Sequence, residues 1–185
     1  DLCGRYIGET APKTAGICRD AYGSVLFIDE AYSLYRGDSD RDYGREALDT
    51  LIAEMENHRT DFVVIMAGYT DEMETMMKGN AGLASRVPYT IEFPNFTREE
   101  LYKIFVAILG KQIAYDDDLL PAVEQYINAL PEEVLDSKEF SNARFIRNLF
   151  ERTLAKAATR SQMERQECVR LTAADFNRAI CDAEF

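Results

Sequence analysis

The sequence has little of what zinc sites and disulfide frameworks are built from. It contains one histidine and four cysteines in 185 residues. Cys3, Cys18, Cys168 and Cys181 lie far apart and include no CxxC pair. We therefore expect neither a zinc site nor a set of disulfide bonds, and a reducing cytoplasm is the compartment that this composition indicates.

Long apolar segments and positive charge are also scarce. No apolar run approaches the ~20 residues that a membrane-spanning helix needs, and the start of the sequence has no signal-peptide pattern. The formal net charge is -12, so the chain as a whole repels a polyanion and gains nothing from counterion release. We therefore expect neither a membrane nor a nucleic acid as a partner.

What the chain does contain is enough apolar side chain for a core, at 46% of its residues. Two continuous apolar runs, Val25 to Ile28 and Phe62 to Met66, predict central strands of a parallel sheet that is covered on both faces. Tyr43 to His58, between them, has apolar residues at helical spacing, which predicts a βαβ crossover. Pro12 to Tyr22 is expected to form the preceding helix, so the first half is α/β.

A third strand is expected at Tyr89 to Phe93, ended by Pro94. Thr97 and Glu100 then form a capping-box pattern for a helix that runs to Leu109.

The rest of the chain predicts helices only. Apolar residues recur at three- and four-residue intervals over 117–130, 142–160 and 172–181, and Thr172 with Asp175 repeats the capping box. The sequence thus predicts an α/β part over residues 1–95 and a small all-helical part over residues 96–185.

The predicted sheet is short of strands. Two fully apolar strands need neighbours and helices on both faces, and the chain offers few elements for this. The first residue is Asp1 and not methionine. We expect a fragment whose sheet lacks its N-terminal part.

The first predicted strand ends in two adjacent acids, in the sequence VLFIDE. Open α/β sheets place their chemistry at the carboxyl ends of their strands, where Asp29 and Glu30 would lie. In nucleotide hydrolysis one such acid orients the Mg²⁺ shell and the other polarises the attacking water. A strand that ends in a solvated acidic turn gives the same pattern, so these residues alone leave both interpretations open.

The order of the surrounding stretches separates the two interpretations. GRYIGETAPKT precedes the acids, FVVIMAGYTDEM and GLASRV follow them, and SNARFIRN lies in the helical half. Over a length that runs to about Arg178, the chain resembles the AAA+ ATPases of the CbxX/CfxQ group. This group includes the red-type Rubisco activases and the stage V sporulation protein K.

The resemblance implies an AAA+ module with an α/β nucleotide-binding part and a helical lid. It implies a hexamer that uses ATP and Mg²⁺ to thread or pull a protein substrate. VLFIDE would then be the Walker B strand, in which Asp29 binds Mg²⁺ and Glu30 activates water. The motifs do not separate an activase from a sporulation protein.

The resemblance also implies a pore loop at Tyr6, Ile7 and Gly8. A flat aromatic ring gives sequence-tolerant contact with a polypeptide, and glycine lets the loop flex. An ordinary tyrosine in a turn is the alternative.

Two arginines match nucleotide-sensing positions of the family. Arg86, in GLASRV, resembles the arginine finger that reaches a neighbouring subunit, and a surface salt bridge is its alternative. Arg144, in SNAR, resembles the sensor 2 arginine, whose planar fork suits a phosphate oxygen. Arg147 is expected to be a surface or packing residue of the lid.

The sequence departs from the family in two places. Sensor 1 is often Asn or Thr, whereas here Tyr69 either fills the role through its hydroxyl or covers the strand end. The phosphate loop GxxxxGK[ST] is missing, and Gly79 to Gly82 is no substitute. In the family this loop lies upstream of the pore loop, so we expect a chain that starts late and binds ATP poorly. A non-catalytic AAA-like interaction module, which lends Arg86 to a neighbour, is the rival interpretation.

Overall fold

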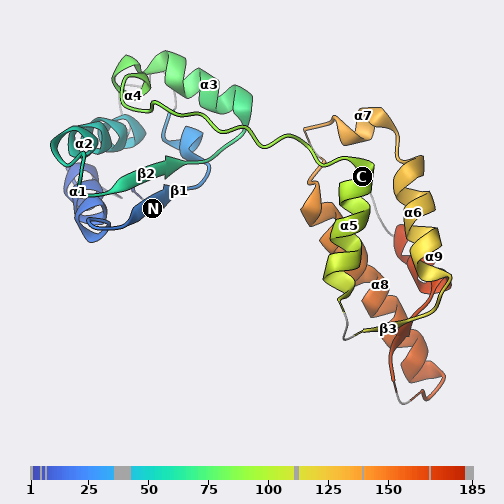
Figure 1. Ribbon diagram of the computed structural model, residues 1–185. Helices are drawn as coiled ribbons and strands as arrows, with labels where there is room; N and C mark the ends of the chain where they lie inside the picture. Colours follow the sequence, from blue (N-terminus) through green and yellow to red (C-terminus); the bar gives the residue numbers. More distant parts are fainter. Residues whose placement is uncertain are drawn as a thin grey trace. The chain divides into compact units, whose positions relative to one another are not determined.

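The computed structural model divides the chain into two compact units, Asp1–Glu92 and Phe93–Phe185 (Figure 1). It describes residues 2–4, 6, 8–35, 43–110, 113–138, 140–166 and 168–181. Each unit is described by itself. In the described part of the chain, no helix combines the length and the apolar character needed to cross a bilayer.

Unit 1 mixes helices with one pair of strands. Its elements are α1 (Thr10–Asp20), β1 (Val25–Ile28), η1 (Ala31–Leu34), α2 (Tyr43–Asn57), β2 (Val63–Met66), α3 (Thr70–Gly79) and α4 (Ala81–Ala84). The predicted strand–helix–strand unit is confirmed, because β1 and β2 pair in parallel with α2 between them in the sequence.

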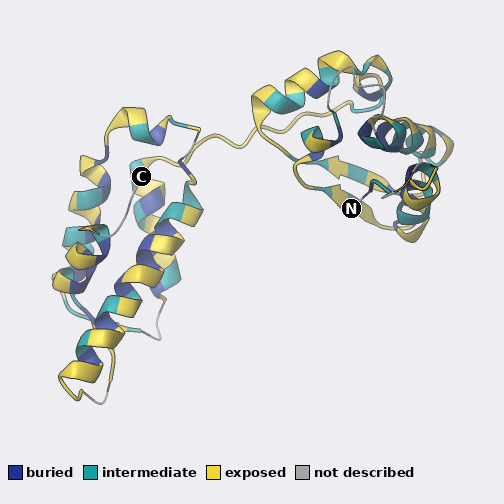
Figure 2. Cartoon of the chain, turned by 180° about the vertical axis from the view of Figure 1, so that it is seen from behind, coloured by how far each residue is buried: buried dark blue, intermediate teal, exposed yellow. Residues whose placement is uncertain are grey.

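Only one face of this strand pair is covered by the described residues. Leu26 and Val64 contact a core that includes Cys18 and Leu51, from α1 and α2. The opposite face carries four exposed apolar side chains: Val25, Phe27, Val63 and Ile65. Figure 2 shows this alternation of partly buried and exposed residues along both strands. The prediction of a sheet covered on both faces is therefore wrong for the described chain, because no second layer of helices packs there.

The strand predicted at Tyr89 to Phe93 is also wrong. These residues have no regular secondary structure, and Tyr89, Ile91 and Phe93 are 84%, 77% and 90% exposed. A strand exists only where a neighbour completes its backbone hydrogen bonds. The described sheet contains only β1 and β2, and neither of them pairs with this segment.

Unit 2 is the predicted helical bundle with one small addition. Its elements are α5 (Arg98–Leu109), β3 (Ala114–Tyr115), α6 (Leu119–Ala129), α7 (Glu132–Leu135), α8 (Ala143–Met163), β4 (Arg170–Leu171) and α9 (Ala173–Cys181). The two-residue strands β3 and β4 pair in parallel. Strands this short carry no periodicity, so the sequence analysis missed them.

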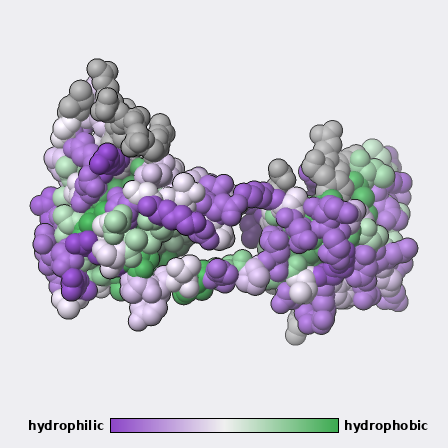
Figure 3. All heavy atoms as spheres, turned by 90° about the horizontal axis from the view of Figure 1, so that it is seen from above, coloured by the Kyte–Doolittle hydropathy of each residue, from purple (hydrophilic) through white to green (hydrophobic). Residues whose placement is uncertain are grey.

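Aromatic side chains fill the centre of unit 2. The rings of Phe150 and Phe176 pack edge-on against Phe105, with centroids 5.8 and 5.9 Å away. Phe105 and Phe176 are fully buried, and edge-to-face packing of this kind adds to the stabilisation from buried area. Apolar atoms also reach the surface of both units, as the space-filling view shows (Figure 3).

Both predicted capping boxes are confirmed. At α5 the Thr97 hydroxyl accepts from the Glu100 amide at 3.3 Å, and Glu100 accepts from the Thr97 amide at 2.8 Å. At α9 the Thr172 hydroxyl accepts from the Asp175 amide at 3.3 Å. The Asp175 carboxylate accepts in return from the Thr172 amide at 3.2 Å.

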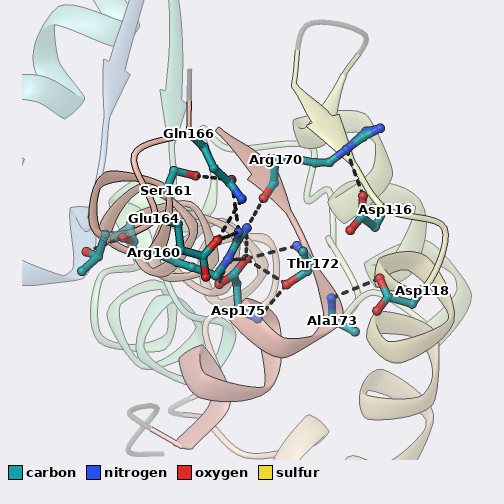
Figure 4. A network of polar contacts seen from close by, with 12 residues as sticks. Asp116, Asp118, Arg160, Ser161, Glu164, Gln166, Arg170, Thr172, Ala173 and Asp175 are labelled. Carbon is teal, nitrogen blue, oxygen red and sulfur yellow. Dashed lines mark hydrogen bonds and ion pairs between the residues drawn. The ribbon is translucent and has the colours of Figure 1, made fainter. Parts of the chain in front are cut away.

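An ion pair joins the end of α8 to the start of α9 (Figure 4). The guanidinium of Arg160 donates to both carboxylate oxygens of Asp175, with Nε 3.1 Å from Oδ1 and Nη2 3.0 Å from Oδ2. Asp175 is fully buried, and Arg160 also donates to the backbone oxygen of Arg170 at 2.7 Å. Because one buried charge is matched by bidentate hydrogen bonds, this pair fixes α9 and β4 against α8.

Asp175→Asn is expected to lower the free energy of unfolding by about 3 kcal/mol, because Arg160 loses the partner of a largely buried pair. The control is Glu164→Gln, which removes an exposed partner of the same Arg160 and should cost no more than about 1 kcal/mol. Urea denaturation followed by circular dichroism measures both. Equal losses of unfolding free energy in the two variants would contradict the stabilising role of the Arg160–Asp175 pair.

The same pair gives a pH dependence with a defined sign. Burial by itself raises the pKa of Asp175, but hydrogen bonds from Arg160 and Thr172 and the charge of Arg160 outweigh it, so the pKa lies below its ordinary value. Its stabilising contribution is therefore present above the unfolded pKa of ~3.9 and is lost as the pH falls through the folded pKa. Acidification below about pH 4 should thus reduce the difference in free energy of unfolding between the wild type and Asp175→Asn.

Candidate active site

Asp29 and Glu30 lie where β1 ends, and both are exposed. Glu30 has φ 48° and ψ 44°, a left-handed conformation that costs a non-glycine residue roughly 1 to 3 kcal/mol. Its amide donates to Oδ1 of Asp29 at 3.0 Å. This strained turn stops the strand, starts η1 and orients the Asp29 carboxylate.

Backbone hydrogen bonds continue the pairing past the ends of the strands. The Ala67 amide donates to the Ile28 oxygen at 2.8 Å, and the Ala31 amide donates to the Ala67 oxygen at 3.0 Å. The two acids therefore share one edge with the segment that follows β2. Tyr69, which is 62% exposed, lies in that segment and precedes α3.

Tyr32 is a member of this edge that the sequence analysis missed. Its ring centroid lies 6.1 Å from that of Tyr69. Burial, followed by the negative charge of Glu30, raises the pKa of its hydroxyl. The sequence offered one indication of this packing, which is the glycine at position 68. In the structure a Cβ at that position would lie 2.6 Å from Cδ1 of Tyr32.

Gly68→Ala is expected to destabilise unit 1 by about 1 to 3 kcal/mol, because the added methyl group overlaps the Tyr32 ring. Gly16→Ala is the matched control. Gly16 lies within α1 with nothing within 4 Å of an added Cβ, so alanine there should stabilise by about 0.5 to 1 kcal/mol. Denaturant unfolding shows whether each substitution raises or lowers the free energy of unfolding. A Gly68→Ala variant with unchanged stability would refute the close approach of Gly68 to the Tyr32 ring.

The acids at this edge suit a Mg²⁺ site in which the phosphates of a nucleotide supply some of the ligands. Mg²⁺ is usually held by one or two carboxylates together with phosphates and water. Asp29 provides an exposed carboxylate of this kind, with Glu30 beside it. Across the described ranges, no group of three or more His, Cys, Asp and Glu residues is placed to hold a metal by itself.

Arg86 contacts other elements of unit 1. Its Nε lies 3.0 Å from Oε2 of Glu56 in the last turn of α2, without the alignment of a hydrogen bond. Its Nη1 donates to the Gly82 oxygen at 3.0 Å and to Oγ of Ser85 at 3.3 Å. The structure thus brings Asp29 together with Glu30 and Tyr69, while the described contacts of Arg86 lie on α2 and around α4. The pair with Glu56 is the salt bridge that the sequence analysis gave as the alternative for Arg86, and only the identity of its partner was not predicted.

Tyr6 lies on a turn before α1 and is 70% exposed. Its amide donates to Oε2 of Glu9 at 3.3 Å, and the neighbouring Gly4 amide donates to Oγ1 of Thr10 at 3.0 Å. Gly8 has φ 85°, a conformation that glycine adopts readily. Ile7, the middle residue of the predicted loop, lies outside the described residues.

Arg144 is exposed in the first turn of α8. Its amide donates to the Ser141 oxygen at 2.9 Å, and Arg147, one turn further on, is also exposed. Both arginines belong to unit 2, and their positions are described relative to that unit only.

Comparison with known proteins agrees with this two-part organisation. Residues 1–95 match the ATPase family associated with various cellular activities (AAA), and residues 97–184 match the AAA lid domain. The chain belongs to the AAA family. The two acids thus end a strand of the AAA part, and Arg144 lies in the AAA lid.

The most similar relatives include proteins of the group that the motifs indicated. Protein CbbX of Cereibacter sphaeroides is 46% identical over 160 residues, covering 86% of this chain and 51% of that protein. The chloroplastic ribulose bisphosphate carboxylase/oxygenase activase of Cyanidioschyzon merolae is 44% identical, covering 86% and 54%. A CfxQ homolog of Galdieria sulphuraria is 44% identical, covering 86% and 52%. These matches confirm the resemblance to the CbxX/CfxQ group, and the chain spans about half the length of these relatives.

Proposed function

We propose that this chain is the ATP-hydrolysing module of a motor that threads or pulls a polypeptide. The observation that carries the proposal is the pair of exposed acids at the end of β1, level with Tyr69 after β2. Membership of the AAA family, a family of ATPases, supports the proposal. An acid pair at the carboxyl end of a strand also suits the chemistry of nucleotide hydrolysis.

In this mechanism the two acids have different tasks. Asp29 would hold Mg²⁺ together with the phosphates of ATP, and the bound metal would supply positive charge against the charge that develops on those phosphates. Glu30 orients the attacking water and accepts its proton at a carboxylate oxygen. The hydrogen bond from the Glu30 amide holds the Asp29 carboxylate against the backbone of Glu30.

Arg86 is proposed to act on the nucleotide of a neighbouring subunit. Its pair with Glu56 is partly exposed, at 30% and 38% of the two side chains, and such pairs contribute only about 0 to 1 kcal/mol. Arg86 can therefore exchange Glu56 for a phosphoryl group at little cost. An arginine finger in that position raises the rate roughly 10³- to 10⁵-fold.

Arg144 and Tyr69 are proposed nucleotide contacts. The exposed guanidinium of Arg144 offers a planar fork to a phosphate oxygen. Tyr69 either reports on the phosphate through its hydroxyl or covers the strand end beside Tyr32.

The phosphate loop is proposed to lie in another part of the whole protein. Two features of unit 1 support this: the exposed apolar face of β1 and β2, and the exposed side chains of Tyr89 and Ile91 near its end. Further strands and helices of an AAA sheet would cover both. The chain alone lacks the GK[ST] donors for the phosphates and should bind ATP weakly.

The proposed partners follow from the same relatives. One relative is named as an activase of ribulose bisphosphate carboxylase/oxygenase, which supports a protein client here. A hexamer in the cytoplasm is proposed as the working form. A non-catalytic interaction module is the second candidate, favoured by the missing phosphate loop. ATP turnover by the whole protein decides between them.

Glu30→Gln in the whole protein, including its phosphate loop, is expected to preserve ATP binding and to lower turnover by about 100-fold or more, because an amide cannot accept the proton. Glu74→Gln, an exposed acid on α3, is the matched control and should leave turnover unchanged. Phosphate release and binding of a fluorescent ATP analogue are measured for both, with the 185-residue chain as a control expected to show neither. Hydrolysis at an undiminished rate in Glu30→Gln would remove the water-activating role.

Tyr6→Ala in the whole protein is expected to abolish remodelling of a client while basal ATP hydrolysis persists, because the exposed ring contacts polypeptide and not phosphate. Tyr6→Phe keeps the aromatic surface and should retain remodelling. Unfolding or reactivation of a client protein is the measurement. If Tyr6→Ala remodels its client as well as wild type does, Tyr6 is an ordinary turn residue.

A further inference from the structure

Asn142, just before α8, combines a strained backbone with an unusual use of its side chain. Its φ is 49° and its ψ is -117°, which is outside the regions that non-glycine residues favour. Among the described residues, only Glu30 and Arg165 are other non-glycine residues with positive φ. Strain of this kind persists only where the surroundings enforce it, and it concentrates at functional sites and switches.

The Asn142 side chain does not cap the helix that follows it. An asparagine at this position normally accepts from an amide in the first turn of its own helix, but no such bond is present for α8. Instead Oδ1 accepts from the Phe96 amide at 3.0 Å, and Nδ2 donates to Oδ1 of Asn95 at 2.9 Å. Nδ2 also donates to the Phe140 oxygen at 3.3 Å.

These bonds fix the segment by which the chain enters unit 2. Unit 1 ends at Glu92, and residues 93–96 have no regular secondary structure that would hold them in place. Asn95 is tied on its other side to the end of α7, because its Nδ2 donates to the Leu135 oxygen at 3.1 Å. Asn142 therefore joins this segment to the start of α8.

The same residue sets the first turn of α8, where Arg144 lies. The Asn142 oxygen accepts from the Ile146 amide at 3.2 Å, and the Arg144 amide donates to the Ser141 oxygen at 2.9 Å. Moving Asn142 therefore moves the turn that presents Arg144. Asn142 thus contacts this turn through its backbone oxygen and segment 95–96 through its side chain.

We propose that Asn142 is a positioning residue that couples a phosphate group held by Arg144 to the segment joining the two units. This rests on the proposed role of Arg144 as a phosphate contact. When Arg144 engages a phosphate, the shift of the first turn of α8 reaches segment 95–96 through Asn142. A residue that only stabilises the bundle would act independently of Arg144.

The test is a double-mutant cycle in the whole protein, including its phosphate loop. Asn142→Gly removes the side-chain bonds, and glycine accepts the positive φ without strain. It should lower kcat/KM for ATP by about tenfold, within the range of coupled neighbours. Combined with Arg144→Ala, it should cause no further loss. Asn148→Ala, an exposed asparagine on α8, is the control and should change nothing.

Two outcomes overturn the proposal in distinguishable ways. If Arg144→Ala lowers kcat/KM and Asn142→Gly multiplies that loss independently, Asn142 has only a structural role and the proposed function of Arg144 stands. If Arg144→Ala leaves ATP kinetics unchanged, both proposals fall. Should Asn142→Gly not fold, Asn95→Ala replaces it in the cycle, because it removes a partner of Asn142 without touching α8.

Discussion

The parallel pairing of β1 with β2 is the constraint on which the candidate active site depends. The strands are in register from Val25 with Val63 to Ile28 with Met66, and two further backbone bonds at Ala67 carry the pairing beyond them. Because the strands end level, residues about 40 positions apart in the sequence share one edge. A slip of one residue would turn the side chains to the opposite face of the sheet and separate the acids from Tyr69.

Local patterns account for the parts of the structure that the sequence predicted well. The apolar run before Asp29 predicted both the strand and the exposed acids at its end, and the capping pair Thr97 and Glu100 marked the start of α5. The failures concern contacts between distant residues. Whether a strand forms at Tyr89 to Phe93 depends on a neighbour, and which acid forms the salt bridge with Arg86 depends on how α2 and α4 pack. Neither leaves a mark on the local sequence.

The lid differs from the α/β unit in being self-contained. Its three packed phenylalanines and the Arg160–Asp175 pair fix α5, α8 and α9 to one another without help from unit 1. Arg144 and segment 93–96 belong to this same unit, so the bonds from Asn142 to Asn95 and Phe96 lie within one packed body. The strained backbone of Asn142 lies close to the point where the chain enters this body.

The exposed face of β1 and β2 has a consequence for the behaviour of this chain in solution. Four strand-forming apolar side chains stand open on it, and within the described residues neither strand has a second partner. Faces and edges of this kind favour pairing between copies of a chain. The net charge of -12 opposes such contact by repulsion, which added salt weakens. Charge repulsion is thus the feature of the chain that opposes association through this open face, so association should increase as the ionic strength rises.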